Sequence, residues 1–158
     1  MNQTTLCVSA IKEGTVIDHI APGGALQMMR IFRLDEKGVQ ITIGLNLQSA
    51  SRGVKDLIKI ERLFLSEKEL ACVAIFSPHA TVNEIRDYKV AQKRALCIPD
   101  AIDALLECPN ARCITRHEPV STCFLVEQYD GLVQLHCRHC EQILSTNANS
   151  EKTIGKTS

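Results

Sequence analysis

Four cysteines in the C-terminal third of the sequence have the spacing of a metal site. Cys108 and Cys113 enclose the residues PNAR, and Cys137 and Cys140 enclose RH. Two thiolates in such a short loop can point into one concavity, and two loops together offer four sulfurs in a tetrahedron. The spacing therefore predicts one structural metal per chain, bound by all four cysteines. Zinc fits this ligand set best, and iron is the alternative that the spacing leaves open.

A metal bound by four cysteines is structural, because a closed site has no open position for a catalytic water. Three neighbouring histidines, His117, His136 and His139, are expected to be bystanders because the four sulfurs already complete the site. A segment of about fifty residues has little core of its own, so the metal is expected to contribute to its folding.

The remaining cysteines and the start of the chain indicate a reducing compartment. The chain has eight cysteines, and those outside the two pairs are scattered singly through apolar segments. The first residues, MNQTTLCVSA, lack a basic segment followed by an apolar one, so we expect no export signal and a cytoplasmic location. In a reducing cytosol paired cysteines bind metal more often than they form disulfides, which leaves an exported disulfide framework as the weaker alternative.

The segment between the two cysteine pairs, CFLVEQYDGLVQLHC, has the pattern of a β-hairpin. Strands are predicted over 123–128 and 132–136, joined at Tyr129-Asp130-Gly131, because Asp-Gly is a strong turn signal. The stretch PDAIDALLE before the first pair is predicted as a short helical linker. We therefore expect a small zinc-ribbon-like (rubredoxin-like) β domain over 98–158, with a disordered polar tail from about residue 147.

Residues 1–97 mix predicted strands and helices. Strands are predicted on both sides of Glu13-Gly14, over 39–48, 56–65 and 71–76, and as a pair within 81–93. Helices are predicted over 24–34 and, briefly, from Ser66, which has a glutamate at the capping-box spacing. The clearest strand is VQITIGLNL, whose odd positions are all apolar. Without a regular βαβ rhythm, the pattern favours an α+β fold with a largely antiparallel sheet.

Composition and charge argue against two broad classes of function. Lysine and arginine number 18, as do aspartate and glutamate, so the net charge is zero. This is not the electrostatic profile of a nucleic-acid binder or of a protein attracted to anionic membranes. No apolar run reaches the roughly 20 residues that a membrane-spanning helix needs. A small anionic ligand is still compatible with the sequence, because a few local lysines suffice to bind one.

Several short motifs together resemble a known family. In order along the chain they are GTVIDHI, ITIGLNL, KDLIKIE, FLSE, ATVN, IPDAID, CPN and EPVS, followed by the second cysteine pair. With the two cysteine pairs, they make the sequence similar to the regulatory chain of aspartate carbamoyltransferase over nearly all of residues 6–145.

The resemblance implies a non-catalytic subunit of a pyrimidine-biosynthetic enzyme. It implies a ferredoxin-like α/β sandwich over 1–97 that binds nucleotide effectors, and a zinc domain that docks on the catalytic chain. It also implies a homodimer through the N-terminal domain, a heteromeric assembly of catalytic trimers and regulatory dimers, and control by CTP, UTP and ATP. The nucleotide-binding residues that it implies here are Val8, Ser9, Ala10, Ile11, Asp18, His19, Lys59, Asn83, Ile85, Tyr88, Val90 and Lys93.

Two other classes of protein are less consistent with the residues. The alternative is a zinc-ribbon nucleic-acid-binding or adaptor protein. A nucleic-acid module needs a basic ribbon with exposed aromatic residues, whereas residues 101–158 contain five basic residues against seven acidic ones. A zinc deaminase needs His-x-Glu with Pro-Cys-x-x-Cys, and a P-loop enzyme needs Gly-x4-Gly-Lys followed by Ser or Thr; the sequence has neither motif.

Overall fold

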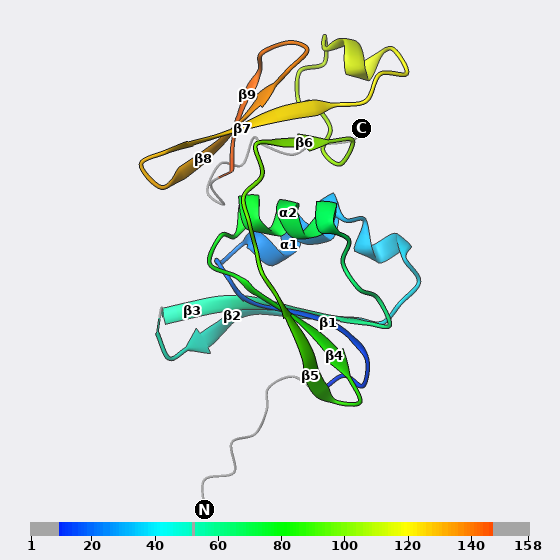
Figure 1. The fold of residues 1–158 in the computed structure, drawn as a ribbon, viewed down its shortest axis with the longest axis vertical. Helices are drawn as coiled ribbons and strands as arrows, with labels where there is room; N and C mark the ends of the chain where they lie inside the picture. The colour runs from blue at the N-terminus through cyan, green and yellow to red at the C-terminus, as the bar shows by residue number, and fades with distance from the viewer. Residues whose placement is uncertain (1–9, 52, 147–158) are drawn as a thin grey trace, which may run out of the picture.

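The computed structural model describes residues 10–51 and 53–146 and contains two antiparallel sheets with helices between them (Figure 1). The first sheet has the strand order β2-β3-β1-β4-β5. Its elements are β1 (Gly14–Ile20), α1 (Gly24–Ile31), β2 (Ile41–Ser49), β3 (Gly53–Glu61), α2 (Glu67–Phe76), β4 (Thr81–Arg86) and β5 (Lys89–Arg94). The series βαββαβ in this order is the ferredoxin-like arrangement, here extended by β5. The predicted α+β class with antiparallel sheets is confirmed.

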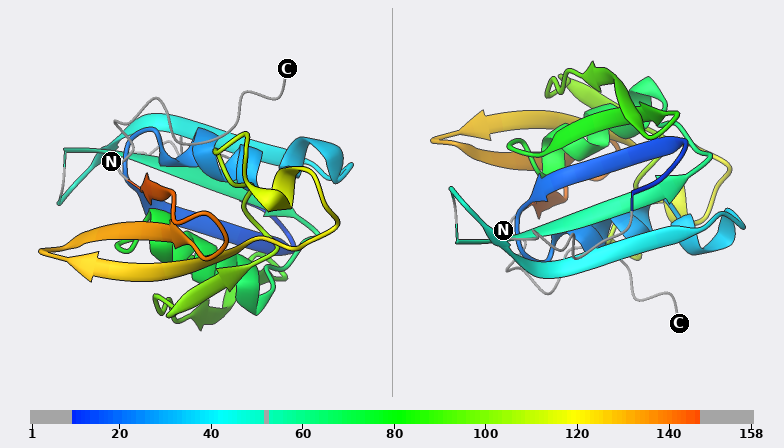
Figure 2. Two further views of the ribbon diagram at one scale, coloured as in Figure 1. Left: turned by 90° about the horizontal axis from the view of Figure 1, so that it is seen from above. Right: turned by 90° about the horizontal axis from the view of Figure 1, so that it is seen from below.

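The two faces of the first sheet differ because successive side chains of a strand point to opposite sides. Ile17 of β1 pairs with Ile58 of β3 and Val82 of β4, and all three are fully buried in the core beneath the helices. The opposite face, called here the outer face, is covered by no helix of the described residues. Figure 2 shows it from below, with the strands in front of α1 and α2.

Local features fix the ends of these elements. The first strand begins at Gly14, where φ is 140° and a Cβ atom would lie 2.0 Å from the carbonyl oxygen of Ile60, so only glycine fits. The second helix begins with the predicted capping box, in which Ser66 and Glu69 satisfy each other's backbone N–H groups. The buried carboxylate of Asp56 accepts hydrogen bonds from the backbone N–H groups of Gly23, Ala25 and Asn46. It therefore connects β3 to the start of α1 and to β2.

The second sheet carries the cysteine-rich segment and has the order β6-β7-β8-β9. Its strands are β6 (Ala101–Asp103), β7 (Cys123–Tyr129), β8 (Leu132–Cys137) and β9 (Ile143–Ser145). The predicted hairpin is confirmed: β7 and β8 are joined by Asp130 and Gly131, both with positive φ, as a tight two-residue turn requires. Phe124 and Leu135 are fully buried in its core.

Two predictions of element type are wrong. Residues 71–76, ACVAIF, are predicted as a strand but belong to α2. A short apolar run has the same appearance in a buried strand and in a buried helix, and here the capping box at Ser66 begins a helix that continues through it. The stretch PDAIDALLE forms no helix: residues 101–103 are β6, because pairing with β7 satisfies their backbone.

Smaller differences concern where elements begin and end. The predicted helix over 24–34 ends at Ile31, before Arg33 takes positive φ, and a 3-10 helix at Leu34–Glu36 follows. The alternation of the 39–48 strand is broken by a register shift between Gly44 and Leu47, which leaves Leu45 43% exposed. Residues 10–13 form no strand before β1. The rest of that predicted strand and the predicted disordered tail lie outside the described residues.

Candidate metal centre and effector surface

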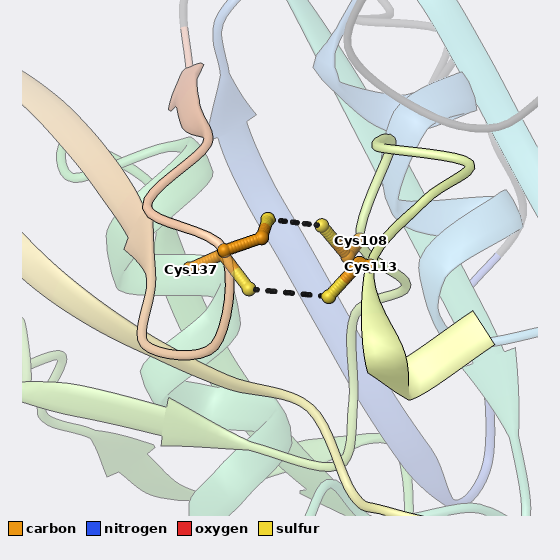
Figure 3. A group of neighbouring side chains, drawn as sticks. Cys108, Cys113 and Cys137 are labelled. Carbon is orange, nitrogen blue, oxygen red and sulfur yellow. Dashed lines mark hydrogen bonds between the residues drawn. The ribbon is translucent and has the colours of Figure 1, made fainter. Parts of the chain in front are cut away.

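The four cysteines meet at one point between two loops. The Sγ atoms of Cys108 and Cys140 are 3.6 Å apart, and those of Cys113 and Cys137 are 3.8 Å apart. All four sulfurs lie within 4.8 Å of one another, and three of the four residues are buried. Figure 3 shows Cys108 and Cys113 pointing from their loop toward the loop of Cys137.

These separations fit a tetrahedral metal and not a disulfide. Four sulfurs at about 2.3 Å from a zinc ion lie about 3.8 Å from one another. A disulfide needs a separation of about 2.05 Å, and every cysteine in the described part of the chain is free. Sulfur is also the donor that zinc and iron share, so the ligand set suits both metals.

Local contacts favour a thiolate at Cys113. Burial opposes its ionisation, but hydrogen bonds from the hydroxyl and backbone N–H of Thr115 lower the pKa of Cys113 to about 6. The hydroxyl donates to Sγ over 3.2 Å. Burial instead raises the pKa of Cys108. A thiol buried in this way favours its neutral form until a cation is bound beside it.

The loops around the cysteines are fixed by backbone and histidine contacts. The backbone N–H of Cys113 donates to the carbonyl of Asn110. The ring of His117 lies 2.7 Å from the carbonyl oxygen of Ala111, and that of His139 lies 3.1 Å from the carbonyl oxygen of Ser121. These ring nitrogens therefore stabilise the loops from outside the sulfur cluster.

Three predicted nucleotide-binding residues lie in one row across the outer face. Val16 of β1 pairs with Lys59 of β3 on one side and with Asn83 of β4 on the other, and Asn83 pairs with Lys93 of β5. Cross-strand partners share a face and have neighbouring side chains. The row Lys59–Val16–Asn83–Lys93 thus places two ammonium groups and one amide on a single surface, formed by segments far apart in the sequence.

The electrostatics of this row are those of a site that is partly withdrawn from water. Burial lowers the pKa of Lys59, while the charge of Asp18 opposes that effect. The Oδ1 atom of Asn83 is buried and has no hydrogen-bond partner within the described residues. A buried acceptor without a partner costs free energy unless a donor reaches it, which is a reason to expect a polar ligand there.

A second group of polar residues lies beside the row, further along β1. Asp18 forms an ion pair with Lys55, with 2.8 Å between Oδ1 and Nζ. The ring of His19 lies 3.2 Å from the hydroxyl of Thr81. A cavity of about 230 Å³ opens beside them, and its lining includes His19, Lys55 and His79. Lys55 was missing from the predicted set, although its even spacing from Lys59 in KDLIKIE places both lysines on one face.

The other predicted residues lie further along β4 and β5, near the β4–β5 turn and the residues before β1. Ile85 pairs with Val90, and the backbone N–H of Tyr88 donates to the carbonyl of Lys12. This contact brings the β4–β5 turn beside the segment that contains Ala10 and Ile11. Ile11 and Ile85 are buried there, whereas Tyr88 and Val90 are exposed. Val8 and Ser9 lie outside the described residues.

Fold and site together define a two-part metal-binding protein, with a ferredoxin-like unit before a four-cysteine β unit. Residues 6–97 match the family model described as "Aspartate carbamoyltransferase regulatory chain, allosteric domain", and residues 100–150 match the "metal binding domain" of the same chain. The chain belongs to the family of aspartate carbamoyltransferase regulatory chains.

Curated relatives with that name cover nearly the whole chain. One from Photobacterium profundum is 44% identical over 150 residues, which are 95% of this chain and 97% of the relative. One from Vibrio vulnificus is 43% identical over 95% of this chain and 98% of its own. One from Serratia proteamaculans is 50% identical over 137 residues, or 87% of this chain and 89% of its own.

Membership of the family defines the role of the chain in general terms. It is a regulatory, non-catalytic chain of an enzyme of pyrimidine biosynthesis, and a regulatory chain implies a catalytic partner chain. It carries an allosteric domain and a metal-binding domain. Among the described residues, no helix is long and apolar enough to cross a membrane.

Proposed function

We propose that this chain binds CTP, UTP and ATP on its outer face and transmits their effect to the catalytic chains of aspartate carbamoyltransferase. The observation that carries the proposal is the row Lys59–Val16–Asn83–Lys93. A nucleoside triphosphate carries several negative charges, a ribose and a polar base. Two lysines with an amide between them match the phosphates, because charge-assisted hydrogen bonds are the strong ones.

The residues around the row supply the other contacts of the proposed site. The carboxylate of Asp18 can accept hydrogen bonds from ribose hydroxyls, and Lys55 and His19 add donors beside it. Backbone groups of the segment that ends in Ala10 and Ile11 suit the edge of the base. The nucleotide set proposed is Val8, Ser9, Ala10, Ile11, Asp18, His19, Lys59, Asn83, Ile85, Tyr88, Val90 and Lys93, to which Lys55 is added.

The metal proposed is one structural zinc per chain, held by Cys108, Cys113, Cys137 and Cys140. The sulfur separations of 3.6 and 3.8 Å support it, because they match the edges of a tetrahedron around zinc. Bound there, zinc would supply crosslinks between the two loops and no chemistry. The division into an effector domain over 1–97 and a zinc domain over 98–158 is part of the same proposal, and the family models meet between residues 97 and 100.

The proposed partners use two further surfaces. Leu125 of β7 and Ile143 of β9 both lie beside His136 on one face of the second sheet and are 42% and 49% exposed. Exposed apolar residues that gather on one face are typical of a protein interface, and we assign this face to the catalytic chain. Within the described residues β2 lies at an edge of the first sheet, and we assign the proposed homodimer of the N-terminal domain to this edge. Catalytic trimers joined by regulatory dimers complete the assembly proposed.

Calorimetric titration of CTP, UTP and ATP into the purified chain tests the nucleotide proposal. We expect saturable binding of each nucleotide triphosphate, and weak binding of the free nucleosides because they lack the phosphates. If none of the three triphosphates gives a binding signal, the proposal is wrong. Two parallel assays address the other classes of function: the chain alone should not transfer carbamoyl groups, and it should not bind oligonucleotides.

A further inference from the structure

One arginine connects three elements of the effector domain. Arg94, the last residue of β5, donates from Nη1 to Oε1 of Glu84 in β4 over 2.6 Å and from Nη2 to Glu67. Glu67 is the first residue of α2. The side chains of Arg94 and Glu84 are only 21% and 12% exposed, whereas that of Glu67 is 85% exposed. The hydrogen bond to Glu84 is the largest of the effects that raise the pKa of Arg94.

The position of Arg94 in the strand relates it to the proposed phosphate site. Lys93 and Arg94 are consecutive in β5, so their side chains point to opposite faces of the sheet. Lys93 pairs with Asn83 on the outer face, and Arg94 pairs with the fully buried Val82 on the helix face. A shift of β5 that follows a ligand on Lys93 therefore moves the guanidinium on the other side.

Helix α2, whose first residue accepts a hydrogen bond from Arg94, lies next to the second sheet. In the structure α2 contacts β6, and buried residues of both elements belong to one continuous apolar core. Figure 1 shows β6 on the side of α2 that faces away from the first sheet. The path from the outer face to the metal-binding unit thus runs through β5, the guanidinium of Arg94, the start of α2 and then β6.

We propose that Arg94 is a positioning residue that couples occupancy of the outer face to the orientation of α2, and through α2 to the second sheet. Arginine suits this role because its planar fork binds two carboxylates at once, whereas a lysine ammonium is a single point charge on a flexible stem. The inference rests on the proposed nucleotide site. It adds that the residue next to Lys93 acts in the response to the ligand and not in its binding.

The test separates binding from response in the complex reconstituted with the catalytic chain. CTP affinity is measured by calorimetry, and the response is the CTP-induced change in the half-saturating aspartate concentration. The variants are Arg94→Gln, Arg94→Lys and Glu67→Gln. The last leaves the buried pair of Arg94 and Glu84 intact and so avoids a folding defect. Arg33→Gln is the matched control, because it removes an exposed arginine–glutamate pair of the same domain.

We expect Arg94→Gln to bind CTP within about twofold of the wild-type affinity while its response falls at least about threefold, since allosteric couplings are typically about 5- to 150-fold. Glu67→Gln and Arg94→Lys should each lose part of the response, and Arg33→Gln none. An unchanged response in both Arg94→Gln and Glu67→Gln would overturn the proposal. So would a tenfold loss of CTP affinity in Arg94→Gln, which would make Arg94 part of the binding site. If the wild-type chain binds no nucleotide, the proposed function itself fails, which is a distinguishable result.

Discussion

Replacing Lys93 by alanine should weaken the binding of CTP and the binding of ATP to a similar degree. Lys93 lies at one end of the row on the outer face, and its side chain is exposed. A hydrogen bond from a charged group contributes about 1.5–3 kcal/mol, and each 1.4 kcal/mol is about tenfold in affinity, so the full range is about 10- to 100-fold. Because water screens an exposed charge, we expect a loss near the lower limit. Lys59, which is half-buried in the same row, should show the larger loss on replacement.

Calorimetry of the Lys93→Ala chain with CTP and with ATP measures both affinities. The two losses should agree, because the nucleotides carry the same phosphates, while the preference between the bases should survive. Lys68→Ala is the matched control: it removes the same charge from an exposed position on α2, on the opposite side of the sheet. An unchanged CTP affinity in Lys93→Ala would refute the assignment of the phosphates to this row.

Two further predictions concern the metal and the core. Cys113→Ala should weaken metal binding, detected by elemental analysis as less than one ion per chain, because the metal loses one of its four sulfur ligands. The effector domain of that variant should still bind CTP, and loss of nucleotide binding would contradict the proposed division into two domains. Asp56→Ala should lower the free energy of unfolding by about 3 kcal/mol or more, because it leaves buried N–H groups without an acceptor. Urea denaturation measures this loss, and a change below about 1 kcal/mol would show that water replaces the carboxylate.

Local sequence patterns are sufficient to predict many elements of this fold. The β7–β8 hairpin follows from alternation and from Asp130-Gly131, and the start of α2 follows from Ser66 with its capping box. The gathering of four sulfurs follows from the two loop spacings. These features depend on residues close in sequence, which is the information that spacing and periodicity carry.

The wrongly predicted elements are those whose secondary structure is determined by tertiary contacts. The run ACVAIF has no periodicity that separates a buried helix from a buried strand, and only the capping box before it indicates helix. The β6 strand exists because β7 pairs with it. The break in β2 after Gly44 depends on a register shift against β3, which alternation within β2 does not report.

The candidate effector site likewise combines features that the sequence predicts with features that depend on the folded chain. Family resemblance supplied Lys59, Asn83 and Lys93, but their common row depends on the register of four strands. Lys55 could have been found from its spacing to Lys59. The partners of Arg94 could not, because Glu67 and Glu84 come from two other elements and meet it only in the folded chain.

The most direct test of the central claim is the aspartate saturation of the catalytic chains, measured with and without this chain and at several CTP concentrations. Catalytic chains alone should show the same half-saturating aspartate concentration at every CTP concentration. In complex with this chain, CTP should change that concentration by about fivefold or more, and aspartate-site ligands should shift CTP affinity in the same direction, because coupling between binding sites is reciprocal. A complex that forms but has the same aspartate saturation with and without CTP, UTP and ATP would contradict the account.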